Sequence, residues 1–181
     1  MELYRERGFD RTTVAEIAER AGLTERTFFR HFADKREVLF WGAGALQEFL
    51  VAAVEGAPPP LAPLEAIAVA LDAAAADIFE ARRRFACERQ AIIAANAELR
   101  ERELIKLATL AVALAEALRR RGVTDPSASL AAEAGIAAFR VAFERWVDEP
   151  GTETLSEILR ASFDELRLVT GGGRTEARRR G

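Results

Sequence analysis

Apolar side chains recur every three to four residues along almost the whole chain, and no segment alternates strictly between apolar and polar positions. This spacing is typical of amphipathic helices and argues against strands. Alanine, leucine, glutamate and arginine predominate, and all four are strong helix formers. Glycines and prolines interrupt the pattern, most clearly at Gly22, Pro58–Pro60, Gly122 and Gly171–Gly173. The sequence therefore predicts an all-α protein.

Residues 12–32 contain the start and stop signals of two short helices. Thr13 followed by Glu16 has the pattern of a capping box, so a helix should begin directly after Thr13. Gly22 suits the left-handed residue that ends this helix, and Thr24 can cap a second helix of about two turns. Two short helices joined by a short turn that contains glycine match a helix-turn-helix.

The second of these short helices has two different faces. Phe28 and Phe32 are four residues apart, so they share a face that should pack inward. Arg26, Phe29 and Arg30 then point outward, where arginine can bind guanine edges or phosphates in the major groove of DNA. A solvated amphipathic helix without a DNA partner is the alternative, and the outward position of Phe29 counts against it.

Composition bears on the other classes of function. Half of the 181 residues are hydrophobic and 30% are charged, the balance of a soluble globular protein. The longest apolar stretch, Leu107–Leu118, is interrupted by Glu116 and is too short to span a bilayer, so we expect no membrane association. The only histidine, His31, lies far from the only cysteine, Cys87, so we expect no metal site, no cofactor and no enzyme. A lone cysteine forms no internal disulfide, which fits the cytoplasm.

The formal net charge of the whole chain is −3, so positive charge can dominate only in a local part of the sequence. Residues 1–40 carry eight basic and eight acidic side chains, whereas residues 41–169 carry fourteen basic and twenty acidic ones. The window 26–36 contains Asp34 as its only acidic residue and four basic residues: Arg26, Arg30, Lys35 and Arg36. A DNA contact would therefore be concentrated around the second short helix.

The run GFDRTTVAEIAERAGLTERTFFRHFADKREVLF, residues 8–40, closely resembles the DNA-binding signature of TetR-family transcriptional regulators. The blocks G-F-x-x-T-T-V-x-x-I-A-x-x-A-G and R-H-F and a lysine that opens the next helix occur in the expected order. The resemblance implies that Thr13 and Lys35 contact phosphate and that the other residues line the recognition helix. The implied DNA-binding residues are Thr13, Thr24, Arg26, Thr27, Phe29, Arg30, His31 and Lys35.

Two positions depart from the residues that are usual in the family. Phe29 stands where many members have tyrosine, so a hydrogen bond from a hydroxyl group to phosphate is unavailable. Arg26 stands where many members have glycine, which adds charge and bulk and should alter the base preference. Neither departure conflicts with the assignment, but no operator sequence follows from it.

The first helix of the motif is short, because only seven residues precede Gly8. Leu3, Tyr4 and Phe9 are left to pack the helix-turn-helix into a three-helix head, and a helix this short is marginal by itself. We expect the chain to begin inside the true first helix of a truncated head. A version extended upstream by about ten to fifteen residues should then melt at a higher temperature and bind DNA more tightly.

Residues 41–169 form the predicted second domain, a helical bundle for ligand binding and dimerisation. One long helix from Lys35 to about Gly56 should connect it to the head, and further helices are expected near 63–81, 83–95 and 97–121. In the family such helices surround a pocket for a small effector, which should here be largely apolar. Candidate lining residues are Phe79, Phe85, Ile92, Ile93, Asn96, Phe139 and Phe143. The alternative is that these apolar residues are ordinary core.

The segments 126–147 and 154–168 favour a two-fold dimer. The first is apolar over most of its circumference, so one side can face its own subunit and the other needs a partner. The second has one apolar stripe, and the family dimerises through such a pair of helices. The candidate contacts are Leu130, Ala134, Ala138, Val141, Leu155, Ile158, Leu159 and Phe163. Residues 170–181 are rich in glycine and then basic, so we expect a disordered tail.

These observations predict a cytoplasmic, homodimeric, one-component transcriptional regulator, a repressor more than an activator. Residues 1–40 should bind a palindromic operator in double-stranded DNA, and a small molecule bound in the second domain should release it. A first alternative is a helical ligand-binding or interaction protein with weak or lost DNA binding, which the near-neutral head suggests. A second is an enzyme that uses buried carboxylates, which no group of residues supports.

Overall fold

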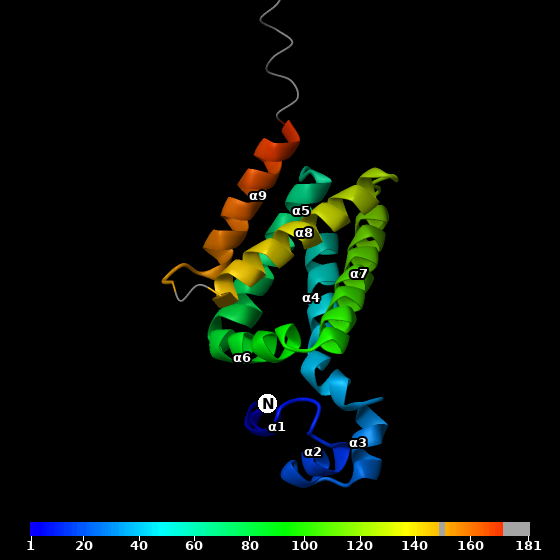
Figure 1. Ribbon diagram of the computed structural model, residues 1–181. Coiled ribbons are helices and arrows are strands. Elements are labelled where there is room, and N and C mark those ends of the chain that lie inside the picture. The colour runs from blue at the N-terminus through cyan, green and yellow to red at the C-terminus, as the bar shows by residue number, and fades with distance from the viewer. Residues whose placement is uncertain (149–150, 172–181) are drawn as a thin grey trace, which may run out of the picture.

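The computed structural model describes residues 1–148 and 151–171, and every regular element in that part of the chain is a helix (Figure 1). The predicted all-α class is confirmed. The head consists of α1 (Glu2–Arg7), α2 (Val14–Arg20), α3 (Glu25–His31) and the 3₁₀ helix η1 (Lys35–Phe40). The main helices of the body are α4 (Ala43–Gly56), α5 (Pro63–Ala74), α6 (Arg83–Ala94), α7 (Ala97–Arg120), α8 (Ser127–Asp148) and α9 (Leu155–Gly171). Most of the expected tail, residues 172–181, lies outside the described part.

The local signals that delimit the helix-turn-helix are present in the structure. The backbone N–H of Glu16 donates to Thr13 Oγ1 at 3.3 Å, and the Thr13 N–H donates to the Glu16 carboxylate at 2.8 Å, which completes the capping box. Gly22 follows α2 with a φ of +67°, a conformation that glycine adopts without steric cost. The Thr27 N–H then donates to Thr24 Oγ1 at 3.2 Å and fixes the start of α3.

Helix α1 completes the head despite its length of six residues. Leu3 and Tyr4 from α1 and Phe9 from the following loop are all buried, as the sequence suggested. The rings of Tyr4 and Phe9 are 5.4 Å apart, and Phe28 of α3 is only 2% exposed. These side chains give the helix-turn-helix a core that its own two short helices could not supply.

The connection between head and body differs from the single long helix that we expected. The 3₁₀ helix η1 ends at Phe40, a turn follows at Trp41 and Gly42, and α4 begins at Ala43. Leu39 and Phe40 are consecutive and both buried, which the tighter winding of a 3₁₀ turn permits. Gly42, a weak helix former, lies at the break.

The stretch Lys35–Gly56 is long and apolar enough to cross a membrane by length and composition. Core helices of soluble proteins meet the same criterion. Here α4 packs between α5 and α7, and its residues Leu50 and Val54 are buried in the core of the body. The apolar composition of this stretch is therefore explained in part by packing within the protein.

The helix expected over residues 63–81 changes its winding partway along. Helix α5 ends at Ala74, a π-helical turn η2 covers Ala75–Phe79, and a 3₁₀ turn η3 covers Glu80–Arg82. Such π-helical turns are uncommon and often occur at functional sites. This one brings Phe79 next to two rings of α8, as described below.

Helix α8 is the central element of the body. It crosses α5 and α7 and also packs against α9 (Figure 1). Gly135 of α8 faces Ile67 of α5, and a Cβ atom added at Gly135 would overlap Ile67 Cγ2. Because Ile67 is fully buried, it has little room to move, and the missing side chain of Gly135 is what allows the two helices to approach.

We expect Gly135→Ala to lower the free energy of unfolding by about 1–3 kcal/mol, the usual cost of overpacking a core. Urea denaturation followed by circular dichroism measures this change. Gly44→Ala is the matched control, since Gly44 is also helical but has open space around its Cα. The control should raise stability by about 0.5–1 kcal/mol. Equal stabilisation by both substitutions would contradict the close approach of α8 and α5.

Candidate nucleic-acid interface

Helix α3 separates the side chains that build the head from those that face outward. Phe28 is buried, whereas Arg26, Phe29, Arg30 and His31 are exposed, with Phe29 exposed by 53%. The outward group combines two guanidinium groups, an imidazole and an aromatic ring on two turns of helix. Its contacts with DNA stay a prediction, but its placement is the one that a recognition helix requires.

The three threonines of the expected interface serve the helix ends. The Thr24 and Thr27 hydroxyl groups are 3.0 Å apart at the start of α3, where both residues lie at or near the surface. The Thr13 hydroxyl donates to Glu16 Oε2 at 3.0 Å. Accepting hydrogen bonds from Thr13 lowers the pKa of the Glu16 carboxyl, so this cap stays ionised at neutral pH.

Lys35 is placed differently from the expected phosphate contact. Its ammonium group donates to the backbone carbonyls of Phe9, Asp10 and Thr12 at 2.8, 3.2 and 3.0 Å. The same group lies 4.4 Å from the centroid of the Phe9 ring. An ammonium group has three hydrogens, and all three are used within the head. Lys35 therefore closes the loop between α1 and α2 in this conformation and does not reach outward.

Tyr4 and Thr12 support this arrangement, although sequence reasoning gave neither of them a polar role. The Tyr4 hydroxyl donates to the Lys35 carbonyl at 2.7 Å. Burial, with a smaller contribution from the Asp34 carboxylate, raises the pKa of Tyr4 well above its ordinary value, so the donor stays protonated. Thr12 is 1% exposed, and its hydroxyl group donates to the Gly8 carbonyl at 2.8 Å.

A carboxylate of the head is held by two cations of the body. Glu37 of η1 accepts from Arg102 Nε at 2.7 Å and from Lys106 Nζ at 3.0 Å, both on α7. Burial favours a raised pKa for Glu37, but the hydrogen bonds from Lys106 and Arg102 outweigh it and hold the pKa of this carboxyl below its usual value. The ion pair is therefore fully formed at neutral pH.

Helix α6 supplies a second link between head and body. Arg89 Nε donates to the Leu39 carbonyl at 2.7 Å, and its guanidinium carbon lies 5.0 Å from the centroid of the Phe40 ring. Arg89 also pairs with Glu103 of α7 at 3.2 Å. Ile93 of α6 belongs to the same apolar cluster as Phe40. These partners are about 50 residues or more apart in the chain, except for Glu103, so no local pattern could reveal them.

The seven residues expected to line an effector pocket occupy three places. Phe79, Phe139 and Phe143 form an aromatic cluster with centroid distances of 5.5–5.7 Å. Ile92 and Ile93 belong to the cluster between head and body, where Asn96 Nδ2 donates to the Ile92 carbonyl at 2.7 Å. Phe85 is 48% exposed on the outer side of α6. The structure thus brings three of the seven together.

The eight residues expected at a dimer interface are also divided. Leu130 and Val141 of α8 are 65% and 55% exposed, and Ala134 is partly exposed. Ala138 is buried, as are the four residues of the α9 stripe: Leu155, Ile158, Leu159 and Phe163. Helix α9 packs against α5 and α8 of its own chain, so these four side chains are covered without a partner, contrary to the expectation.

A helix-turn-helix head with an exposed cationic helix, fixed on a helical body, defines the class of helix-turn-helix DNA-binding regulators. Residues 1–40 match the family model described as bacterial regulatory proteins of the tetR family. Residues 61–170 match the model described as the MftR C-terminal domain. The chain belongs to the TetR family of bacterial regulatory proteins.

Regulators of known sequence or structure are similar to this chain. The HTH-type transcriptional regulator TcmR of Streptomyces glaucescens is 42% identical over 73 residues, which are 40% of this chain and 32% of TcmR, about a third of its length. The TetR-family repressor FadR of Thermus thermophilus, solved in complex with lauroyl-CoA, has a TM-score of 0.56 and 24% identity over 97% of this chain and 92% of that one. This likeness shows the fold. The TetR-family regulator PfmR, also of Thermus thermophilus, gives a TM-score of 0.49 and 26% identity over 91% and 92% of the two chains.

We expect Lys35→Met to destabilise the protein by about 1–3 kcal/mol, because the substitution leaves backbone carbonyls of the head without their donor. Thermal and urea unfolding measure the change. Arg26→Met is the matched control, since Arg26 is exposed and makes no hydrogen bond or ion pair among the described residues. The control should leave stability unchanged. If the Lys35→Met protein is as stable as the parent, the contacts of Lys35 within the head contribute nothing to stability. Its ammonium group would then be available to phosphate.

Proposed function

We propose that this TetR-family protein is a one-component transcriptional regulator of the cytoplasm that binds a palindromic DNA operator as a homodimer. It acts as a repressor, and a small, largely apolar effector releases it from DNA. The observation that carries the proposal is the outward face of α3, where the side chains of Arg26, Phe29 and Arg30 are exposed. A short helix with this face, packed against the preceding helix α2, fits the major groove.

The charges of the head support a small and local DNA contact. Arg26 and Arg30 form no ion pair among the described residues, so their guanidinium groups are available to phosphates or bases. Lys35, by contrast, is used within the head, and Arg36 is held by Asp34 at 2.9 Å. A dimer presents each available arginine twice, so the proposed DNA contact depends on these local groups and not on the net charge of residues 1–40.

Arg30→Ala should weaken binding to a selected operator and relax the preference for one base pair in each half-site. Removing a good bidentate contact to a base costs about 1–3 kcal/mol. If Arg30 binds phosphate instead, the slope of affinity against salt should fall by about 0.9 for each subunit. Fluorescence anisotropy with labelled duplexes over a range of salt concentrations separates the two cases.

Arg120→Ala is the control for this experiment. Arg120 pairs with Glu55 at the end of α7 far from the head, so its loss should leave DNA binding unchanged.

The alternative, a helical protein that has lost useful DNA binding, gains its support from the neutral head. It is favoured if no duplex from a randomised pool is enriched and if binding to duplex DNA shows no dependence on salt.

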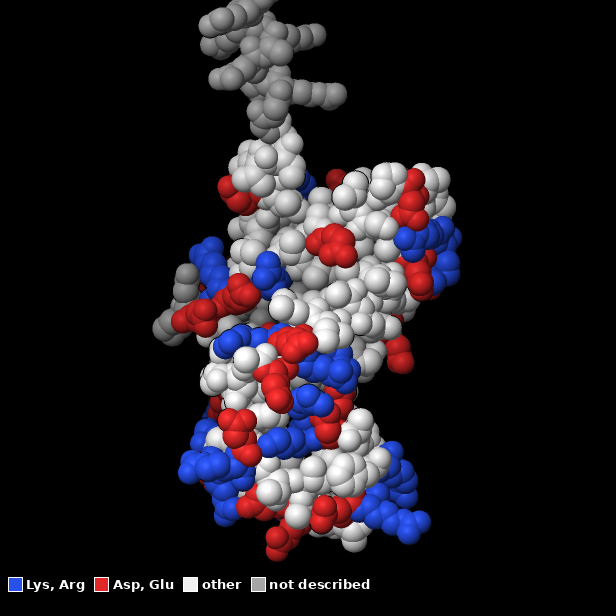
Figure 2. Space-filling model, turned by 45° about the vertical axis from the view of Figure 1, so that its right-hand side comes forward, with Lys and Arg blue, Asp and Glu red and all other residues white. Residues whose placement is uncertain are grey.

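Dimerisation through α8 is supported by the apolar side chains that the subunit leaves exposed. Leu130 and Val141 lie on the outer side of α8, and Leu168 and Val169 are exposed at the end of α9. On the face drawn in Figure 2, the middle of the body away from the head is mostly uncharged, whereas the head and its junction carry many charged side chains. Leu130 and Val141 are eleven residues apart and so lie on the same side of α8, where they suit contact with a second subunit.

Val141→Glu should convert the dimer to a monomer that still folds, because Val141 is exposed in the single subunit. Val112→Glu is the matched control, since Val112 of α7 is 57% exposed. Sedimentation equilibrium and circular dichroism measure assembly and folding together. Monomeric parent protein at micromolar concentration, or equal effects of both substitutions, would contradict an interface on α8.

The aromatic cluster of Phe79, Phe139 and Phe143 is the best-supported place for an apolar effector. It joins the π-helical turn η2 to α8, and its rings are packed against one another. A ligand that separates these rings would shift α6 through its contacts with α8, and Arg89 would carry this shift to the Leu39 carbonyl of the head. The similar FadR structure contains lauroyl-CoA, and a fatty acyl chain matches the apolar cluster, so compounds with a fatty acyl chain are the first effectors to test.

A further inference from the structure

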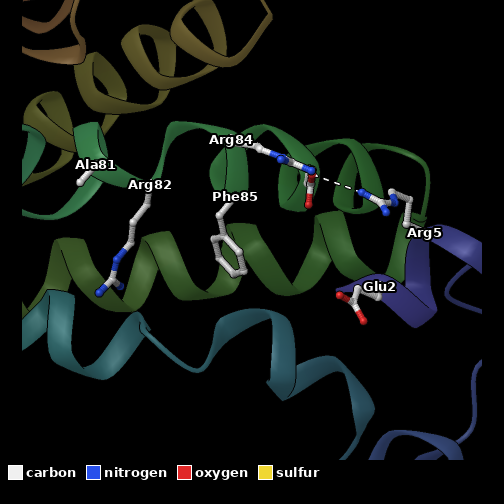
Figure 3. A pocket seen from close by; sticks show the side chains of 7 residues that line it. Glu2, Arg5, Ala81, Arg82, Arg84 and Phe85 are labelled. Atoms are coloured by element: carbon white, nitrogen blue, oxygen red, sulfur yellow. Dashed lines mark hydrogen bonds and ion pairs between the residues drawn. The ribbon is translucent and has the colours of Figure 1, made fainter. Parts of the chain in front are cut away.

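We propose that a groove on the outer side of α6 binds a small amphipathic organic anion and that the bound anion joins the head to the body. The groove has a volume of about 430 Å³ and lies between α1 of the head and the η3–α6 segment of the body (Figure 3). This volume is within the usual range for small-molecule sites. The site is separate from the aromatic cluster of the body, none of whose residues line it. Its residues are Glu2, Arg5, Ala81, Arg82, Arg84, Phe85 and Glu88.

The carboxylates of the groove are already neutralised by arginines. Glu2 Oε2 lies 3.0 Å from Arg20 Nη1. Glu88 Oε1 lies 3.0 Å from Arg84 Nε and 3.4 Å from Arg5 Nη1, so two guanidinium groups share one carboxylate oxygen. Each guanidinium has five N–H donors, and most of those of Arg5 and Arg84 remain free for a second anion.

Arg82 adds a cation with no carboxylate partner among the described residues. Figure 3 shows Arg82 and Phe85 extending in the same direction from η3 and α6, while the Arg84 side chain runs along α6 toward Arg5 of α1. The groove therefore carries an excess of positive charge. An anionic group such as a carboxylate or phosphate matches it, because arginine binds these groups through two parallel hydrogen bonds.

Phe85 supplies the apolar half of the site. Its ring is 48% exposed and lines the groove together with Ala81. A flat apolar group can lie against this ring while its anionic substituent reaches the arginines. A purely inorganic anion would leave the ring uncovered, so the site favours an organic anion over free phosphate.

A ligand in this groove would contact both parts of the protein. Glu2 and Arg5 belong to the head, whereas Ala81–Glu88 belong to the body. The ligand would thus add to the contacts that hold α1 against α6, where Tyr4 and Ile93 share an apolar cluster and the exposed Arg5–Glu88 ion pair contributes little. This regulatory consequence rests on the proposed function. By linkage, any change that the ligand makes in operator affinity equals the change that the operator makes in ligand affinity.

The probe is 8-anilinonaphthalene-1-sulfonate, which joins a flat apolar group to an anion and fluoresces when it leaves water. We expect Arg82→Gln and Phe85→Ala each to weaken its binding to the full-length protein by about tenfold or more, the loss expected for one charge-assisted hydrogen bond or one covered ring. Uncharged N-phenyl-1-naphthylamine should bind more weakly and should not respond to Arg82→Gln. Inorganic phosphate should compete only at much higher concentration.

Two matched controls separate this groove from other apolar surfaces. Val112→Ala removes an exposed apolar side chain of α7, and Arg120→Gln removes an exposed arginine at the far end of α7. Neither should change the affinity for the probe. Binding that is the same in the parent and in both groove variants would overturn the proposal.

Failure of the groove and failure of the proposed function are distinguishable. Operator binding by the parent together with probe binding that ignores Arg82 and Phe85 would overturn the groove alone. Groove-dependent probe binding by a protein that selects no duplex DNA would overturn the regulator alone. Circular dichroism of each variant confirms folding, which is expected because both substituted side chains are exposed.

Discussion

The head depends on one ammonium group. Lys35 Nζ satisfies the carbonyls of Phe9, Asp10 and Thr12 and lies over the Phe9 ring, while the Lys35 carbonyl accepts from Tyr4. These contacts join α1 and the α1–α2 loop to the start of η1. Helices α2 and α3 lie between these joined segments in the chain. Because α1, α2 and α3 have six or seven residues each, none would persist alone in water. The orientation of the recognition helix therefore rests on a polar contact in which every donor of the lysine is used.

The head is in turn fixed to the body by contacts of two kinds. Glu37 is held by Arg102 and Lys106 of α7, and both cations and the carboxylate are mostly covered. Beside them the apolar cluster joins Tyr4, Phe9 and Phe40 of the head to Ile93 and Leu99 of the body. A buried ion pair is favourable only if its charged groups form all their hydrogen bonds. Here both carboxylate oxygens of Glu37 accept a hydrogen bond, one from Arg102 and one from Lys106. The head therefore moves as one unit with the end of α6 and the start of α7 unless this junction opens.

Local signals in the sequence predicted the head well, whereas contacts between distant segments escaped them. The capping box at Thr13, the left-handed Gly22 and the cap at Thr24 are each determined within four residues, so the two helices of the motif were placed correctly. Outward-facing Phe29 followed from helical spacing alone. The contacts of Lys35 within the head escaped prediction because its carbonyl partners lie 23 or more residues away, while its contact with phosphate stays a prediction. The α9 stripe was misjudged for a related reason: spacing identifies an apolar face but does not tell whether its own subunit or a partner covers it. The break after Phe40 escaped prediction because it depends on the burial of two consecutive residues at the junction.

Helix α6 presents a different surface to each of its neighbours. Arg83 donates to the Trp146 carbonyl of α8, and Arg89 reaches the Leu39 carbonyl of the head. Phe85 faces the groove shared with α1. A change on any of these sides must alter the others, because a helix of 12 residues moves as a rigid body. Separation of the aromatic cluster would act on the α8 side, while an anion in the groove would act on the α1 side and oppose movement of the head. The two sites would therefore be coupled through one helix, and their effects on DNA affinity need not have the same sign.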